Sequence, residues 1–278
     1  MNTAQRIIKY FAIAFAVLII GGIISAMITG VMLLSYIFDD RDDGEIVPGT
    51  AEVIEIGDIT GEKITGLHID VKATSVTLEL GEKLAVIADD ETVAVSQNGD
   101  ALYVREKEVH FWSGWSWNDR EIRVVLPRDE GELETLRVNN GAGRVMISGL
   151  VARNLELDLG AGRAELNQVK AIERAKINGG AGHLAVRESE LHDLDLDMGV
   201  GKVELGAKLT GNNRIDAGIG KLELDLRGKL DEYKIKVEKG LGSIELNGEK
   251  LSNGAIRGEG DTLVDIDGGV GAIEIRTE

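Results

Sequence analysis

Apolar and polar residues alternate through the second half of the chain, and short glycine-flanked corners interrupt the alternation. In the segment LELDLGAGRAEL, which spans residues 155–166, leucines alternate with polar residues before the corner, and Ala164 and Leu166 continue the alternation after it. A period of two residues is typical of a β-strand, whereas an amphipathic helix has a period near 3.6. Each unit is therefore predicted to be a strand, a tight corner and a second strand.

The corner is a glycine-x-glycine motif that occurs seven times at nearly constant spacing. Its first glycines are separated by 19, 20, 19, 19, 22 and 29 residues, and a period near 20 residues is the mark of a stacked repeat. Glycine suits a tight corner because it adopts backbone angles that strain residues with a Cβ atom. The predicted structural corner glycines are Gly141, Gly143, Gly160, Gly162, Gly180, Gly182, Gly199, Gly201, Gly218, Gly220, Gly240, Gly242, Gly269 and Gly271.

Coils of this kind bury their apolar positions only when they stack. Neighbouring coils about 4.8 Å apart would align equivalent residues in columns joined by parallel hydrogen-bond ladders. We therefore predict an all-β fold in which residues 127–278 form a parallel β-solenoid of Gly-x-Gly coils about 20 residues long. Two predicted core columns are Leu157, Ile177, Leu196 and Ile215, and Leu166, Val186, Leu205 and Leu224. The apolar residues between the two glycines are also expected to point into the coil: Ala142, Ala161, Ala181, Val200, Ile219, Leu241 and Val270.

The region at 51–126 is predicted to contain a first β coil and a hairpin insertion. LHIDVKATSVTLEL, near 67–80, aligns with the repeat if Lys72, Ala73 and Thr74 replace glycine-alanine-glycine. Short alternating runs follow, joined by turn residues such as Asn98-Gly99-Asp100, and these favour hairpins.

Residues 10–38 contain no charged side chain and are almost wholly apolar. As a helix they would exceed the ~30 Å of bilayer hydrocarbon, whereas the alternative, a cleaved signal peptide, usually has an apolar core of about 7–15 residues. Arg6 and Lys9 precede the span and DDRDDGE follows it. The positive-inside rule then places residues 1–9 in the cytoplasm and, after a linker at 39–50, the C-terminal domain outside the cell. The predicted localisation is a single-pass anchor in the cell membrane.

Charge and composition narrow the function. The formal net charge is −17, and residues 1–40 sum to zero, so the part beyond the span is acidic and would be repelled by nucleic acid. The chain has no cysteine, and its four histidines form no metal-spaced pair. No catalytic residue, cofactor or metal is predicted. An enzyme acting on polysaccharides, which long β-solenoids can host, is the weakest alternative.

Two polar columns are predicted to flank the corner. One stands two positions before each first glycine: Asn139, Asp158, Asn178, Asp197, Asp216, Glu238 and Asp267. The other stands three positions after it: Arg144, Arg163, His183, Lys202, Lys221, Ser243 and Ala272. We hypothesise that the two columns pair across the corner, because stacked like charges repel. The rival hypothesis is that the acidic column binds calcium.

All three tryptophans lie in the segment HFWSGWSWND at 110–119. This segment is expected either to cover part of the solenoid, to offer an aromatic platform for sugars, or to rest on the bilayer interface. The predicted surface-contact residues are Trp112, Trp115 and Trp117.

An apolar span, an irregular β region ending in VVLP and repeated NNGAGRVMI-type corners together resemble a bacterial putative-adhesin family of unknown function. Its members carry a β-strand repeat, and some are membrane-anchored envelope proteins of the LiaG type, linked to envelope-stress operons in Gram-positive bacteria. The resemblance covers about residues 50–278 and implies a non-enzymatic adhesin-like or scaffold module. Its partners would be the membrane and envelope polymers or proteins. The alternative is a self-assembling solenoid whose exposed end strand pairs with another copy.

Overall fold

The computed structural model describes residues 52–54, 63–88, 93–106, 120–128 and 132–278. The chain divides into two compact units, Met1–Ile46 and Val47–Glu278, and every described residue belongs to the second. The predicted membrane span at 10–38 and the linker at 39–50 lie outside the described residues and stay predictions. Across the described segments, no helix has the length and apolarity needed to cross a membrane.

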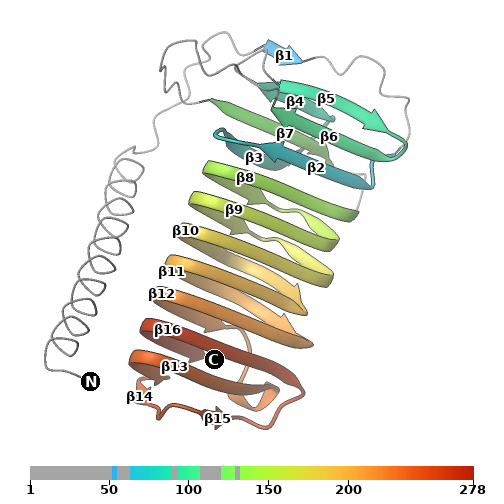
Figure 1. The fold of residues 1–278 in the computed structure, drawn as a ribbon. Helices are drawn as coiled ribbons and strands as arrows, with labels where there is room; N and C mark the ends of the chain where they lie inside the picture. Colours follow the sequence, from blue (N-terminus) through green and yellow to red (C-terminus); the bar gives the residue numbers. More distant parts are fainter. Residues whose placement is uncertain (1–51, 55–62, 89–92, 107–119, 129–131) are drawn as a thin grey trace, which may run out of the picture. The chain divides into compact units, whose positions relative to one another are not determined.

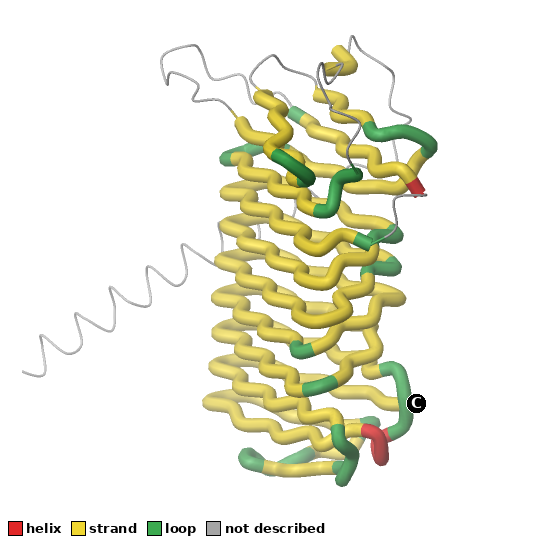
Figure 2. The backbone as a smooth tube through the Cα atoms, turned by 90° about the vertical axis from the view of Figure 1, so that its right-hand side faces the viewer, coloured by secondary structure: helices red, strands yellow, loops and turns green. Residues whose placement is uncertain are grey.

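One continuous, mostly parallel sheet winds through the second unit as a stack of coils (Figure 1). The strands that carry a glycine-x-glycine corner are β8 (Leu133–Ser148), β9 (Val151–Asn167), β10 (Lys170–His192), β11 (Leu194–Thr210), β12 (Asn212–Leu226), β13 (Tyr233–Leu246) and β16 (Thr262–Thr277). Neighbouring strands pair in parallel on both sides of the corner. The all-β, solenoid-like fold is confirmed, and Figure 2 shows the coils lying one on another.

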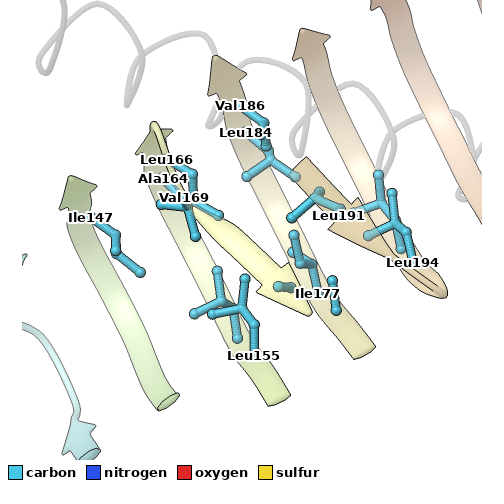
Figure 3. Packing of buried hydrophobic residues seen from close by; sticks show 14 of the residues in the cluster. Ile147, Leu155, Ala164, Leu166, Val169, Ile177, Leu184, Val186, Leu191 and Leu194 are labelled. Atoms are coloured by element: carbon cyan, nitrogen blue, oxygen red, sulfur yellow. The ribbon is translucent and has the colours of Figure 1, made fainter. Parts of the chain in front are cut away.

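The two predicted core columns are present. Leu196 pairs in register with Ile177 on one side and Ile215 on the other, and the column through Leu166 and Val186 is aligned in the same way. All eight side chains are at most 1% exposed. Figure 3 shows part of this cluster, with side chains directed into the space that the coils enclose.

Stacking explains why the corner must be glycine. The second glycine of each corner has a positive φ, for example 143° at Gly201. A Cβ atom built on Gly201 would lie 1.8 Å from the carbonyl oxygen of Gly182 in the preceding coil. Both the backbone angle and the close approach of the coils therefore exclude a side chain at this position.

The predicted degenerate first coil consists of β2 (Gly66–Val71) and β3 (Ser75–Gly81), which pair in parallel with the two arms of β8. The predicted hairpin at Asn98-Gly99-Asp100 joins β5 (Val93–Asn98) to β6 (Ala101–Glu106). The stack also extends further than predicted, because β6 and β7 (Glu121–Pro127) pair in parallel with β2 and β3 and add another coil. Two short antiparallel strands, β4 (Ala85–Ala88) and β1 (Glu52–Ile54), continue the sheet from β7.

The coils do not follow chain order at the other end of the stack. β16, the last strand in the chain, lies between β12 and β13 and pairs in parallel with both (Figure 1). A 3-10 turn at Leu230–Glu232 precedes β13. The outer edge of β13 is covered by two short antiparallel strands, β14 (Glu249–Lys250) and β15 (Ala255–Arg257).

The apolar residue between the two glycines was expected to point into the coil, but none of the seven is buried: five are half-buried and two are exposed. Leu241 is 70% exposed and Val270 is 49% exposed. The inward positions nearest the second corner are Leu159, which is partly buried against the core, and Ala164, which is buried. These positions are an odd number of residues apart, so the alternation shifts phase at the corner. The residues between them therefore lie on the outside of the bend.

Candidate functional surface

The corners stack into a narrow apolar ridge on the outside of the coils. Equivalent residues are in register from coil to coil, and their side chains grow from alanine to larger aliphatic groups towards β13. We call this set the corner ridge. In spatial order it consists of Ala142, Ala161, Ala181, Val200, Ile219, Val270 and Leu241.

The acidic column stands on one side of the corner ridge. In the first coils amide and carboxylate side chains alternate, so that Asn139 Nδ2 donates to Asp70 at 3.2 Å and Asn178 Nδ2 donates to Asp158. An amide between two carboxylates separates their charges and gives them a hydrogen-bond donor. Further along, Asp216 accepts a hydrogen bond from Arg214 Nε at 2.8 Å.

The basic column stands on the other side of the ridge, and its partners differ from those predicted. Arg163 Nε lies 2.7 Å from Glu165, Lys202 Nζ lies 3.1 Å from Glu223, and Lys221 Nζ lies 3.0 Å from Glu274. The predicted pairing across the corner was therefore wrong. The outward ridge residues separate the two columns, whereas the glutamates lie on the same strand face as the basic residues, two positions further on.

His183 is a half-buried member of the basic column, with 25% of its side chain exposed. Burial, with the positive charges of Arg163 and Lys202, lowers its pKa, and this outweighs the opposing effect of Glu204. Its Nε2 atom lies 3.3 Å from Glu204 Oε2. The hydrogen bond from Lys202 lowers the pKa of Glu204, which keeps this carboxylate charged.

A column of alternating charge runs along the outer face of the first arm, four positions before each first glycine. Its members in spatial order are Arg137, Glu156, Lys176, Asp195, Arg214, Asp265 and Lys236. Direct contacts include Arg137 Nε with Glu156 at 2.8 Å and Lys236 Nζ with Asp265 at 3.4 Å. We call this set the alternating column. Sequence reasoning missed it, although the recurrence of a charge at this offset is visible in the repeat.

An aromatic pair continues the alternating column into the first coils. His68 is in register with Arg137 and with Tyr103, and its ring stacks on that of Tyr103 with centroids 4.8 Å apart. The Arg105 guanidinium lies 5.0 Å from the centre of the Tyr103 ring. Burial and the charges of Arg137 and Arg105 lower the pKa of His68, so the neutral ring is favoured.

All fourteen predicted glycines lie at the corners. The first glycines of four corners, Gly141, Gly160, Gly180 and Gly199, line a shallow groove beside the acidic column. Trp112, Trp115 and Trp117 lie outside the described residues. The chain enters and leaves that segment at Glu106 and Arg120, whose side chains form a 3.2 Å ion pair. Within the described segments, no three His, Asp or Glu side chains are grouped closely enough to hold a metal ion.

Two solved structures resemble this fold. One is described as a "putative cell adhesion protein" from Clostridium sporogenes, with 18% identity over 82% of this chain and 99% of that chain, at a TM-score of 0.33. The other is a "putative adhesin" from Bacteroides fragilis, with 13% identity over 77% of this chain and 94% of that chain, at a TM-score of 0.41.

No curated protein gives a significant match to the chain. The Toastrack DUF4097 family model, in contrast, matches residues 64–262, which include the first coil and most of the corner repeats. The resemblance to a family of unknown function, drawn from the glycine corners, is thereby confirmed. The chain belongs to the Toastrack DUF4097 family.

Proposed function

We propose that this protein is a non-enzymatic, adhesin-like or scaffold module of the bacterial cell envelope, held at the membrane by residues 10–38. The observation that carries the proposal is the corner ridge with its flanking columns. The same groups recur once per coil, about 4.8 Å apart, along the length of the stack. Such a surface suits an extended partner, a polymer strand or a second protein, better than a small substrate.

The protonation state of the surface carboxylates also favours binding over catalysis. A general acid needs a raised pKa, so that it keeps its proton at neutral pH. Hydrogen bonds from lysines lower the pKa of Glu204 and of Glu223 instead. These side chains are therefore ionised partners of the lysines in the basic column.

The cap at β13 supports a monomeric scaffold over end-to-end polymerisation. Gly254 N donates to the Val237 carbonyl at 3.0 Å, and Leu251 N donates to the Ile244 carbonyl at 2.9 Å. Asn253 Oδ1 accepts from Lys239 N at 2.8 Å beside the corner. Several backbone groups on the outer edge of each arm of β13 thus already have partners, which leaves a second copy fewer groups to pair with there.

The proposal is tested in two steps with the full-length protein. Protease added to intact protoplasts should remove the C-terminal domain, and full protection would contradict the extracytoplasmic location. Detergent-solubilised protein is then sedimented with purified cell-wall sacculi and passed over immobilised envelope proteins. Retention by at least one of these is expected, and retention by neither would contradict an adhesin-like or scaffold role.

A matched pair of variants tests whether the corner ridge is the contact surface. Leu241→Ser changes the most exposed ridge residue, whereas Ile256→Ser changes a residue that is 51% exposed on β15, outside the ridge. The ridge variant should weaken retention several-fold and the control should not. Equal effects of the two substitutions on retention would show that the corner ridge is not the contact surface.

A further inference from the structure

The position of β16 shows that a gap in the stack is filled by a strand from later in the chain. Chain connections between the preceding coils are one or two residues long, such as Asp193 and Gly211. The connection from β12 to β13 is longer, spans residues 227–232, and passes over one place in the stack. β16 occupies that place, although in the chain it follows β14 and β15, which cover the far side of β13.

The gap recognises its strand through side chains as well as through backbone. Val264, Ile266 and Ile275 of β16 are at most 1% exposed, so they complete three core columns. Ile266, for example, lies in register between Ile215 of β12 and Val237 of β13. An inserted strand must therefore carry apolar residues at these alternate positions.

Two further features make the gap selective. A Cβ atom on Gly271 would lie 1.7 Å from the Gly220 carbonyl oxygen, so the inserted strand must carry glycine at the corner. Asp265 lies in register between Arg214 and Lys236, so an acidic residue is favoured at that position. β16 meets all these requirements. β9 and β11 meet them too, but both of their edges are already paired within the stack, so β16 is the strand left to fill the gap, and a second copy supplies an identical one.

The hinge that delivers β16 is short and rich in glycine. It consists of residues 258–261, in which Gly258 has a φ of 75° and Gly260 N donates to the Tyr233 carbonyl at 3.1 Å. β14 and β15 each pair locally with β13, whereas β16 must also reach β12, more than thirty residues earlier. Because closing a short loop costs less entropy than closing a long one, we expect the local pairings to form first and to leave the gap open until β16 docks.

We propose that the gap between β12 and β13 is a strand-acceptor site, filled by β16 of the same chain in the monomer and by β16 of a second copy in a strand-exchanged dimer. The exchanged dimer keeps each ladder, core column and ion pair of β16, and only the hinge changes conformation. This exchange differs from end-to-end stacking, because the covered outer edge of β13 takes no part in it.

Cysteine cross-linking of full-length chains tests the proposal, since the chain has no cysteine of its own. Asp225 and Arg276 are exposed register partners on β12 and β16, and their side chains form a 3.0 Å ion pair. One tagged copy carries Asp225→Cys and a second, differently tagged copy carries Arg276→Cys. The two are co-expressed and oxidised, and an Asp225→Cys to Arg276→Cys disulfide between chains is measured by its two tags.

Two controls give each outcome a meaning. A copy with both substitutions should close the disulfide within one chain, which shows that the geometry allows it. Lys208→Cys, an exposed position on β11 whose register partner is Glu190, replaces Asp225→Cys to measure random collision. The register pair Lys221 and Ala272 repeats the test at a second position, so that no single disulfide geometry decides it.

Strand exchange predicts inter-chain cross-linking several-fold above the Lys208→Cys control at one or both register pairs, rising with expression level. Cross-linking at the level of that control for both register pairs would overturn the proposal. Neither outcome depends on envelope binding, so the test of strand exchange is independent of the proposed adhesin-like role.

Discussion

The carboxylate of Asp265 lies 3.4 Å from the Lys236 ammonium, although the coil of Lys236 comes earlier in the chain. On its other side Asp265 is in register with Arg214. If the coils had stacked in chain order, Arg214 and Lys236 would be neighbours and two positive charges would lie about 4.8 Å apart. The alternating column is thus consistent with the observed order of β12, β16 and β13 and opposes the simpler one.

Reversing the charge of Asp265 should therefore destabilise this end of the stack. Asp265→Lys places three positive side chains in succession, and because these groups are partly exposed the expected cost is only about 1 kcal/mol. Urea unfolding at low salt measures it, and about 1 M NaCl should remove most of the loss by screening. The control is Asp261→Lys, a change of the same charge at an exposed position outside the column. A loss that is equal in both variants would exclude a role for the column.

The core columns predict a large effect for truncation of a buried leucine. Leu196 is 1% exposed and lies between Ile177 and Ile215, so Leu196→Ala should lower the free energy of unfolding by about 2–5 kcal/mol. Leu241→Ala removes the same atoms from a residue that is 70% exposed and should change it by less than about 0.5 kcal/mol. Denaturant unfolding of both variants checks the difference, and similar losses would mean that the corner ridge is buried in solution.

The second glycine of the corner predicts the least tolerated substitution. Gly201→Ala forces a positive φ on alanine and places a methyl group 1.8 Å from the Gly182 carbonyl oxygen, so a loss of about 3 kcal/mol or more is expected. In Gly206→Ala the nearest atom is 3.4 Å away, and the change should cost less than about 1 kcal/mol. Soluble yield and thermal unfolding compare the two. A stable Gly201→Ala protein would contradict the observed spacing of the coils.

Local pattern and long-range order differ in how well the sequence predicts them. The period of two residues places Leu196 in the core, and the repeat spacing places Gly201 beside Gly182, because both depend on residues of one repeat unit. The position of β16 depends on which coils become neighbours, and a repeat pattern is nearly the same for every pair. The charges of Arg214, Asp265 and Lys236 distinguish the two possible orders. The difference becomes visible only when the residues at the same offset from each corner are compared from coil to coil.

The candidate surface was only partly predictable for a related reason. The acidic and basic columns are visible at fixed distances from each first glycine. Whether they meet depends on the direction of the side chains through the corner, where the alternation changes phase. That phase change turned Leu241 outward and left Lys221 closer to Glu274 than to Asp216.

The depressed pKa of His183 predicts a pH dependence of stability with a definite sign. Burial lowers the folded-state pKa below the value of about 6.5 found in unfolded chains. As the pH falls below that value, the unfolded state takes up a proton before the folded state does, so the free energy of unfolding decreases. His183→Gln cannot take up this proton. The stability of wild type relative to His183→Gln should therefore fall between about pH 7.5 and 5.5.

Glu204 provides the matched test, because its charge opposes the depression of the His183 pKa. In Glu204→Gln the folded-state pKa of His183 should fall further, so acidification should cost this variant more stability than it costs wild type. The Glu204 pKa is itself lowered, so in wild type this carboxylate stays ionised across the tested window and adds no slope of its own. Urea unfolding at intervals of half a pH unit measures all three proteins. Parallel curves for wild type and His183→Gln would show that His183 is not desolvated in the stack.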